Sequence, residues 1–173
     1  MLAYVFSHRP AGGVDVAAYE DSLRRFHMEL ARASLDGFIE SMTFAIGDGY
    51  TDWYLLESSS AMDVLNAAAV SGPRAAAHDA AARVATDGVG KLFSLVSGRP
   101  SMDEGFEVRF GKLAGMAYPD LYARLEPWTE GRGVSLWRRM MVLGPPPEFS
   151  LITPSKVDLP AEMHPEVLHR KPI

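Results

Sequence analysis

The stretch HRPAG at residues 8–12, with an amphipathic segment after it and FAIG at residues 44–47, has a shorter echo later in the chain. The echo is GKLAG at residues 111–115, again followed by an amphipathic segment and then by MVLG at residues 141–144. In both copies the pattern predicts a strand, a helix and then a hairpin. A duplicated β-α-β-β unit is therefore the simplest interpretation of the sequence.

Strands are predicted in the first hundred residues wherever apolar residues alternate with polar or smaller ones. They are expected at residues 2–7, 38–46, 53–56 and 89–96. The sequence Gly47-Asp48-Gly49 is a turn signal, and it joins the second and third of these strands in a hairpin.

Two helices are predicted between these strands. Apolar residues at three- and four-residue intervals indicate a helix over residues 16–30, with Asp15 as its N-cap. The second helix should begin with a capping box at Ser60 and break at Pro73, because proline lacks the backbone N–H that a helix interior needs. The order of elements is that of a ferredoxin-like unit, which we assign to residues 1–100.

Residues 105–156 predict an incomplete βαββ repeat. Its elements are expected at 106–110 (strand), 118–125 (a helix that Pro127 ends) and 136–143 with 149–152 (hairpin). Residues 157–173 hold three prolines and no room for the remaining helix and last strand of a full repeat. We expect this segment to be an extended C-terminal arm, which either clasps a neighbouring subunit or is a loosely ordered terminus.

The predicted fold class is thus α+β. A ferredoxin-like βαββαβ sheet is followed by the incomplete βαββ repeat, and the two form an α/β barrel by pairing within the chain or between subunits. We expect a homodimer.

Composition narrows the function classes. The formal net charge of -5, with scattered Lys and Arg, argues against nucleic-acid binding, which normally needs a clustered basic face. The chain has no cysteine, which excludes disulfides and thiolate chemistry and fits a reducing compartment. No signal-peptide core and no run of membrane-spanning length is present, so we expect a cytoplasmic protein without a membrane partner.

The opening segment resembles the EthD-like members of the dimeric α/β-barrel superfamily. The resemblance is carried by Arg9-Pro10, Gly12-Gly13, Tyr19, Phe26-His27 and Leu30, with the spacing from Tyr19 to His27 retained. It implies a barrel of two facing sheets with a ligand cleft between sheet and helices. Members of this superfamily include polyketide cyclases, cofactor-free monooxygenases, muconolactone-type isomerases and haem enzymes, so the fold alone does not select a function.

Two residues are the candidate catalytic pair. His27 lies at the edge of the apolar helix stripe, where its imidazole could reach the cleft as a general base. Tyr54 could hold a carbonyl oxygen while the base removes a neighbouring proton. Trp53 and Tyr54 must point to opposite faces of the sheet, one toward the helices and one into the barrel. The alternative is that the two aromatic residues only pack, and that His27 lies at the rim of the core and bonds a backbone carbonyl.

Further side chains are candidates for ligand binding. His8 ends the first strand at the expected cleft mouth, and Arg74 lies beside a helix start at Pro73 that could hold an anion. Arg139, with Lys112 and Glu148, could place charge in the cleft of the second half, although a cross-strand ion pair explains it equally well. The full set is His8, Arg9, Trp53, Asn66, Arg74, His78 and Arg139.

No metal or cofactor is expected. The sequence has no paired-histidine zinc motif and no glycine-rich phosphate loop. The family resemblance leaves haem as a minor alternative, because some barrel relatives bind haem through a histidine on the helix that carries His78.

Two functions remain open. The first is a protein that binds a small, partly aromatic or polyketide-like molecule in the cleft, with cofactor-independent acid/base catalysis of the cyclase, isomerase or monooxygenase type. The second is a non-catalytic structural or oligomerisation module whose barrel is filled by its own side chains. The cleft distinguishes them, because catalysis needs His27 and Tyr54 to converge on one enclosed pocket.

Overall fold

A computed structural model describes residues 1–141 and 143–173 of the chain; Val142, within the predicted strand 136–143, lies outside the described residues. The elements are β1 (Leu2–Pro10), α1 (Val16–Ala31), β2 (Phe38–Ile46), β3 (Gly49–Leu56), α2 (Ser60–Ala69), α3 (Gly72–Ala82), β4 (Ala85–Gly98), β5 (Gly105–Phe110), α4 (Tyr118–Thr129), β6 (Ser135–Arg139), β7 (Phe149–Thr153), the 3₁₀ helix η1 (Ala161–Met163) and β8 (Glu166–Pro172).

The strands form one closed antiparallel barrel in the order β1-β3-β2-β8-β5-β7-β6-β4. Strands β1 to β4 are arranged as β4-β1-β3-β2, and strands β5 to β8 repeat that arrangement as β8-β5-β7-β6. The two sheets join where β4 pairs with β6 and where β2 pairs with β8. The duplicated topology is therefore present, and the barrel closes within one chain; the homodimer stays a prediction.

The prediction that no last strand follows the second hairpin is wrong. Residues 157–173 contain η1 and β8, and β8 pairs with both β5 and β2. The prolines do not prevent this, because Pro165 precedes the strand and Pro172 is its last residue. The short helix η1 occupies the place of the second helix of the repeat, so the second copy is complete but abbreviated.

The helix predictions hold with two corrections. Asp15 caps α1 as predicted, accepting a hydrogen bond from the backbone N–H of Ala18 at 2.8 Å. The helical segment around Pro73 does divide into α2 and α3. The predicted capping box is wrong, because the N-cap of α2 is Ser59 and its side chain makes no capping bond. The predicted end at Pro127 is also wrong, since α4 continues to Thr129.

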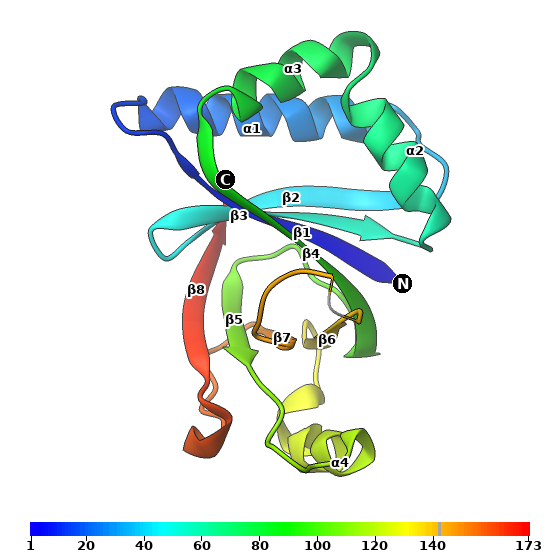
Figure 1. Cartoon of the computed structure of the whole chain (residues 1–173), viewed down its shortest axis with the longest axis vertical. Helices are drawn as coiled ribbons and strands as arrows, with labels where there is room; N and C mark the ends of the chain where they lie inside the picture. The colour runs from blue at the N-terminus through cyan, green and yellow to red at the C-terminus, as the bar shows by residue number, and fades with distance from the viewer. Residues whose placement is uncertain (142) are drawn as a thin grey trace.

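Helices cover the two ends of the molecule. Figure 1 shows α1, α2 and α3 together over the sheet of the first half, while α4 and η1 lie at the opposite end, beyond the second half. None of the helices among the described residues combines the length and apolar character needed to cross a membrane.

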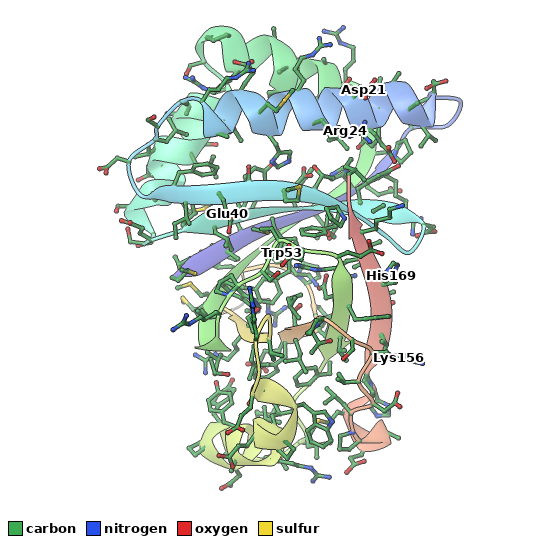
Figure 2. All side chains as sticks on the ribbon, turned by 180° about the vertical axis from the view of Figure 1, so that it is seen from behind. Asp21, Arg24, Glu40, Trp53, Lys156 and His169 are labelled. Atoms are coloured by element: carbon green, nitrogen blue, oxygen red, sulfur yellow. The ribbon has the colours of Figure 1, made fainter. Side chains whose placement is uncertain are left out.

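The interior of the barrel is packed with large side chains. Trp53 lies 5.6 Å from Trp137 in an edge-to-face arrangement and stacks on Phe93 at 6.3 Å. The guanidinium of Arg170, 1% exposed, lies 4.0 Å from the centre of the Phe44 ring. Trp53 is on the barrel side of its strand, away from α1 (Figure 2). Any ligand space must therefore lie outside this packed region.

Candidate active site

Strand register assembles a polar cluster on the helix-facing side of the first sheet. Tyr4, Phe6 and His8 alternate along β1 and share one face, as residues two apart in a strand do. On the neighbouring β3, the residue opposite Phe6 is Asp52. On the next strand, β2, the residue opposite Asp52 is Thr43. The register thus places a carboxylate in the middle of an aromatic sheet face.

A cavity of about 320 Å³ lies between this sheet face and helices α1 to α3. Most of its wall is apolar, with aromatic rings from the sheet and both alanines and larger apolar side chains from the helices. Its lining residues with polar groups are Tyr4, His8, Tyr19, Asp52, Tyr54, Asn66 and His78. This volume lies at the lower end of the ~300–1,000 Å³ typical of small-molecule pockets.

Asp52 is the centre of the polar cluster. Its Oδ1 accepts a hydrogen bond from the Thr43 hydroxyl at 2.6 Å and one from His27 Nε2 at 3.3 Å. Its Oδ2 lies 3.2 Å from Nε2 of His8, within ion-pair range but off the line of a hydrogen bond. The Tyr54 hydroxyl donates to the same oxygen over 3.4 Å. A buried carboxylate is tolerated when it is partnered in this way.

These partners keep Asp52 ionised. Burial by itself would raise the pKa of the carboxyl, but the hydrogen bond from His27, the contact with His8 and the charges of the two imidazoles hold that pKa well below its usual range. A carboxylate fixed between two imidazoles can orient both rings and stabilise a positive charge on either of them.

His8 connects Asp52 to Tyr19 along the cavity wall. Its Nδ1 lies 2.5 Å from the hydroxyl of Tyr19, which α1 places against the cavity wall. Because the ionised Asp52 faces Nε2, we assign the Nε2–H tautomer, in which Nδ1 accepts the Tyr19 O–H. Tyr19, His8 and Asp52 therefore form a chain of polar contacts along the cavity wall that ends on the carboxylate.

His27 lies behind this chain. Its Nε2 faces Asp52, its Nδ1 is 2.6 Å from the Ser41 hydroxyl, and its ring stacks on Tyr54 with centroids 5.2 Å apart. The predicted pair His27 and Tyr54 thus meets at Asp52. Tyr54 lines the cavity, whereas His27 is not among the lining residues.

The tyrosines of the site stay protonated. Burial, followed by the negative charge of Asp52, raises the pKa of Tyr4, of Tyr19 and of Tyr54. Each hydroxyl is therefore a hydrogen-bond donor at neutral pH, and none of them is ionised to a phenolate base.

Two glycines in β4 make room for the aromatic floor of the cavity. A Cβ at Gly88 would lie 2.7 Å from the Phe6 ring, and one at Gly90 would lie 2.7 Å from the Tyr4 hydroxyl. Neither position has a left-handed backbone, so the glycines are explained by the close approach of the two rings.

The remaining predicted residues are dispersed. Asn66 and His78 line the cavity, but Arg74 folds back to donate to the carbonyl of Ala68 at 2.8 Å. Arg9 pairs with Asp48 on the surface at 2.8 Å. Trp53 faces the barrel interior and Tyr54 faces the helices. The prediction that these two neighbours point to opposite faces of the sheet is therefore confirmed.

Arg139 lies far from this cavity. It lines a separate space at one end of the barrel, together with Lys112 and Glu148. The predicted grouping of these three side chains is therefore present, but the suggested cross-strand ion pair of Arg139 is not among the ion pairs of the described residues.

Asp52 and Tyr19 were missed as site residues. In the sequence, Tyr19 is marked only by the family motif to which it belongs. Asp52 carried one usable signal: it is an acidic residue inside an otherwise apolar strand, two positions before Tyr54 and so on the same face. Its partners His8, His27 and Thr43 come from three other elements, and only the register shows that they meet.

The cavity does not fit haem. His78 sits on α3 with Nδ1 3.2 Å from Asp79 and its ring edge-on to Phe26. A macrocycle held there would need more than the present 320 Å³, and the helices would have to separate. Within residues 1–141 and 143–173, no three His, Asp or Glu side chains are placed to hold a metal ion.

The fold is similar to those of two solved structures. One is a "putative monooxygenase" from Lactobacillus acidophilus NCFM, with a TM-score of 0.56 and 8% identity over 87% of this chain and 75% of the other. The second is an anthrone oxidase-like protein, with a TM-score of 0.55 and 9% identity over 98% of this chain and 72% of the other. At such identities the likeness concerns the fold.

No protein-family model and no curated protein matches the sequence. The comparisons and the coordinates together identify the chain as an α+β protein with an eight-stranded antiparallel barrel, similar in fold to the monooxygenase and anthrone oxidase-like structures.

Proposed function

We propose that this protein catalyses a cofactor-independent proton transfer on a small, flat and mostly apolar molecule that carries a carbonyl or hydroxyl group. The observation that carries the proposal is the chain from Tyr19 through His8 to Asp52, which begins at the wall of a cavity and ends on a buried carboxylate. General acid and base groups need this combination of a proton path and an oriented imidazole.

When substrate binds, a proton moves from the substrate through Tyr19 to His8. The Tyr19 oxygen accepts a proton from the substrate while its own proton moves to Nδ1 of His8. The imidazolium formed on His8 is stabilised by Asp52 at 3.2 Å. The pair of electrons left on the substrate delocalises onto its carbonyl oxygen as an enolate. Reversing the path returns the proton to a different atom of the enolate, which completes an isomerisation.

Tyr54 supplies the donor for that enolate oxygen. Its hydroxyl lies 3.4 Å from Asp52, which is longer than a normal O–H···O bond, so it can turn to a substrate oxygen at small cost. His27 acts through Asp52, which it holds from the side away from the cavity, and is a positioning residue.

The walls of the cavity support the substrate class. Rings of Tyr4 and Phe6 form a floor, and the small side chains of Ala69, Ala81 and Ala82 face them from the helices. A flat apolar body fits between such surfaces, with its polar group toward His8 and Tyr54. The solved structures of similar fold bear the names monooxygenase and anthrone oxidase-like, which is compatible with carbanion chemistry of this kind.

Anthrone, a flat ketone with an acidic methylene group, is a suitable probe. In deuterated buffer without oxygen, the protein should accelerate exchange of the methylene hydrogens, followed by NMR. His8→Gln should slow that exchange by about 100-fold or more, within the ~10²–10⁴ range of general base catalysis. The matched control His169→Gln removes an exposed histidine on β8 and should leave the rate unchanged.

Two outcomes would contradict the proposal. Failure of anthrone and related flat C–H acids to bind would reject the substrate class. Binding with equal exchange rates in wild type and His8→Gln would reject the catalytic role of His8.

The second candidate, a non-catalytic module, is favoured by one observation. The barrel interior is filled by Trp53, Phe93 and Trp137. On this view the outer cavity binds a ligand without turnover, and anthrone would bind tightly while its exchange stayed at the buffer rate.

A further inference from the structure

The helices above the cavity carry two polar side chains that the proposed proton transfer does not use. The residues of α2 that line the cavity recur at helical spacing along one stripe: Met62, Leu65, Asn66 and Ala69. The lining residues of α3 follow the same spacing: His78, Ala81 and Ala82. Asn66 and His78 are thus polar residues on helix faces that are otherwise apolar toward the cavity.

Asn66 and His78 lie where the cavity meets solvent. Asn66 is exposed, and the side chain of His78 is 36% exposed. The polar groups on the sheet are buried by contrast, since His8 is 3% and Asp52 4% exposed. The cavity therefore has a buried polar region on the sheet and a second polar region at its mouth. We call Asn66 and His78 the mouth pair.

His78 keeps one free hydrogen-bond acceptor. Its Nδ1 lies 3.2 Å from Oδ1 of Asp79, and a carboxylate accepts but does not donate. We therefore assign the Nδ1–H tautomer, in which the neutral ring has a bare Nε2. This Nε2 makes no hydrogen bond to another described residue. A ligand group that meets it must bring its own proton.

Asn66 complements this acceptor. Its carboxamide offers two N–H donors and one acceptor oxygen, and it makes no hydrogen bond to another side chain of residues 1–141 or 143–173. A hydroxyl group both donates and accepts, so it can use Nε2 of His78 and the carboxamide together. A carbonyl or ether oxygen cannot satisfy Nε2, because it has no proton to donate.

The charges around the mouth pair favour a neutral ligand group. The carboxylate of Asp79 lies beside His78. Arg74, the cation of the same helix turn, donates from Nε to the carbonyl of Ala68 at 2.8 Å and does not line the cavity. An anionic ligand group would therefore meet Asp79 without a cation to offset the repulsion.

We propose that the mouth pair is a specificity site for a hydroxyl group on the end of the substrate remote from its enolisable carbon. The hydroxyl donates to Nε2 of His78 and forms a further hydrogen bond with the Asn66 carboxamide. This inference rests on the proposed function, from which it takes the flat body with its carbonyl toward His8 and Tyr54. A substrate held at both ends has one orientation, and that orientation keeps its acidic C–H at Tyr19.

Isothermal titration calorimetry with three ketones tests the mouth pair. β-Tetralone is a bicyclic aromatic ketone with acidic methylene groups, and its hydroxy and methoxy derivatives carry the substituent on the aromatic ring, remote from the carbonyl. The methoxy ketone keeps the substituent oxygen and lacks its proton. Wild type should bind the hydroxy ketone about tenfold more tightly than the methoxy ketone, and more tightly than β-tetralone itself.

Variants assign that preference to residues. His78→Leu and Asn66→Leu should each reduce it to about twofold or less, because each removes one hydrogen-bond partner of the hydroxyl. His78→Gln keeps an acceptor oxygen and should retain part of the preference. The matched control His169→Leu removes an exposed histidine on β8, outside the cavity, and should leave all three affinities unchanged.

Equal binding of the hydroxy and methoxy ketones to wild type would overturn the inference, and so would a preference that either leucine variant leaves intact. Binding is measured separately from catalysis. A hydroxyl preference that depends on the mouth pair, together with equal deuterium exchange in wild type and His8→Gln, would reject the catalytic proposal alone. Failure of all three ketones to bind would reject both.

Discussion

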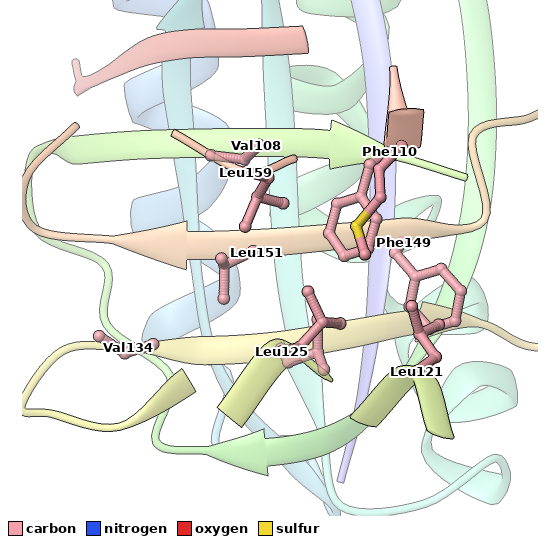
Figure 3. Close-up of a cluster of buried hydrophobic side chains, with 10 residues drawn as sticks. Val108, Phe110, Leu121, Leu125, Val134, Phe149, Leu151 and Leu159 are labelled. Carbon is pink, nitrogen blue, oxygen red and sulfur yellow. The ribbon is translucent and has the colours of Figure 1, made fainter. Parts of the chain in front are cut away.

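The two halves of the barrel share a strand order but differ in what lies between sheet and helix. In the first half, β1 and β3 present Tyr4, His8, Asp52 and Tyr54 to the helices, and a cavity remains. In the second half, β5 and β7 present apolar residues that pack directly on α4, as Figure 3 shows for Val108, Phe110, Phe149 and Leu151 around Leu121 and Leu125. A duplicated scaffold thus carries a polar pocket in one copy and a dry core in the other.

The difference shows what the site requires of the scaffold. The dry core is built from buried apolar side chains, and its stability comes from apolar burial. The pocket keeps a carboxylate and two imidazoles away from water, which is unfavourable unless each is partnered. Thr43, Ser41 and Tyr19 supply those partners. The second half therefore contributes stability, while the first half contributes the reactive groups.

The largest effect should come from matched cavity mutations in the two halves. Leu125→Ala empties a fully buried position against α4 and should lower the free energy of unfolding by about 3 kcal/mol, within the ~2–5 range for such changes. Leu23→Ala enlarges an existing cavity and should cost about 2 kcal/mol or less, because fewer contacts are lost. Urea unfolding measures both. Equal losses would break the comparison between a dry core and a pocket.

Asp52 should make the first half sensitive to acid. Its pKa is lower in the folded protein than in the unfolded chain, so it contributes stability above the unfolded value of about 3.9, and that stability is lost as the pH falls below it. Asp52→Asn should therefore be less stable than wild type at pH 7 by about 1–3 kcal/mol. The difference in unfolding free energy between wild type and Asp52→Asn should become smaller below about pH 4. A gap that stays constant from pH 7 to pH 3 would contradict the ionised, partnered state of Asp52.

The smallest effect concerns the floor of the pocket. Gly90→Ala brings a methyl group to 2.7 Å from the Tyr4 hydroxyl, so the ring must move toward the cavity. Stability should change by less than about 1 kcal/mol, because the Tyr4 ring borders a cavity into which it can turn and because alanine restricts the unfolded chain. Anthrone affinity, measured by fluorescence titration, should fall about tenfold. The control Gly12→Ala has open space around its added methyl group and should leave affinity unchanged.

Local patterns predicted much of the fold and part of the site. Periodicity and backbone chemistry depend only on residues that are close in sequence. They predict the strand at residues 38–46, the first helix with its Asp15 cap and the break near Pro73. The sequence pattern does not predict β8, because prolines argue against a strand, although a proline before the strand and one at its last position cost few ladder bonds.

The polar cluster depends on information that is not local. His8 and Tyr54 were predicted and both line the cavity, but Asp52, the residue that joins them, is paired with His27 from 25 residues away. A one-residue slip between β1 and β3 would turn Asp52 to the barrel interior, and no single segment of sequence specifies that register.

The most direct test of the central claim is a double-mutant cycle on anthrone exchange with Tyr19→Phe and His8→Gln. If Tyr19 and His8 act as one proton path, each single variant should lose most of the activity, and the double variant should be no slower than the slower single variant. If the losses multiply, the two residues act independently, and the proton path from the cavity to Asp52 does not exist.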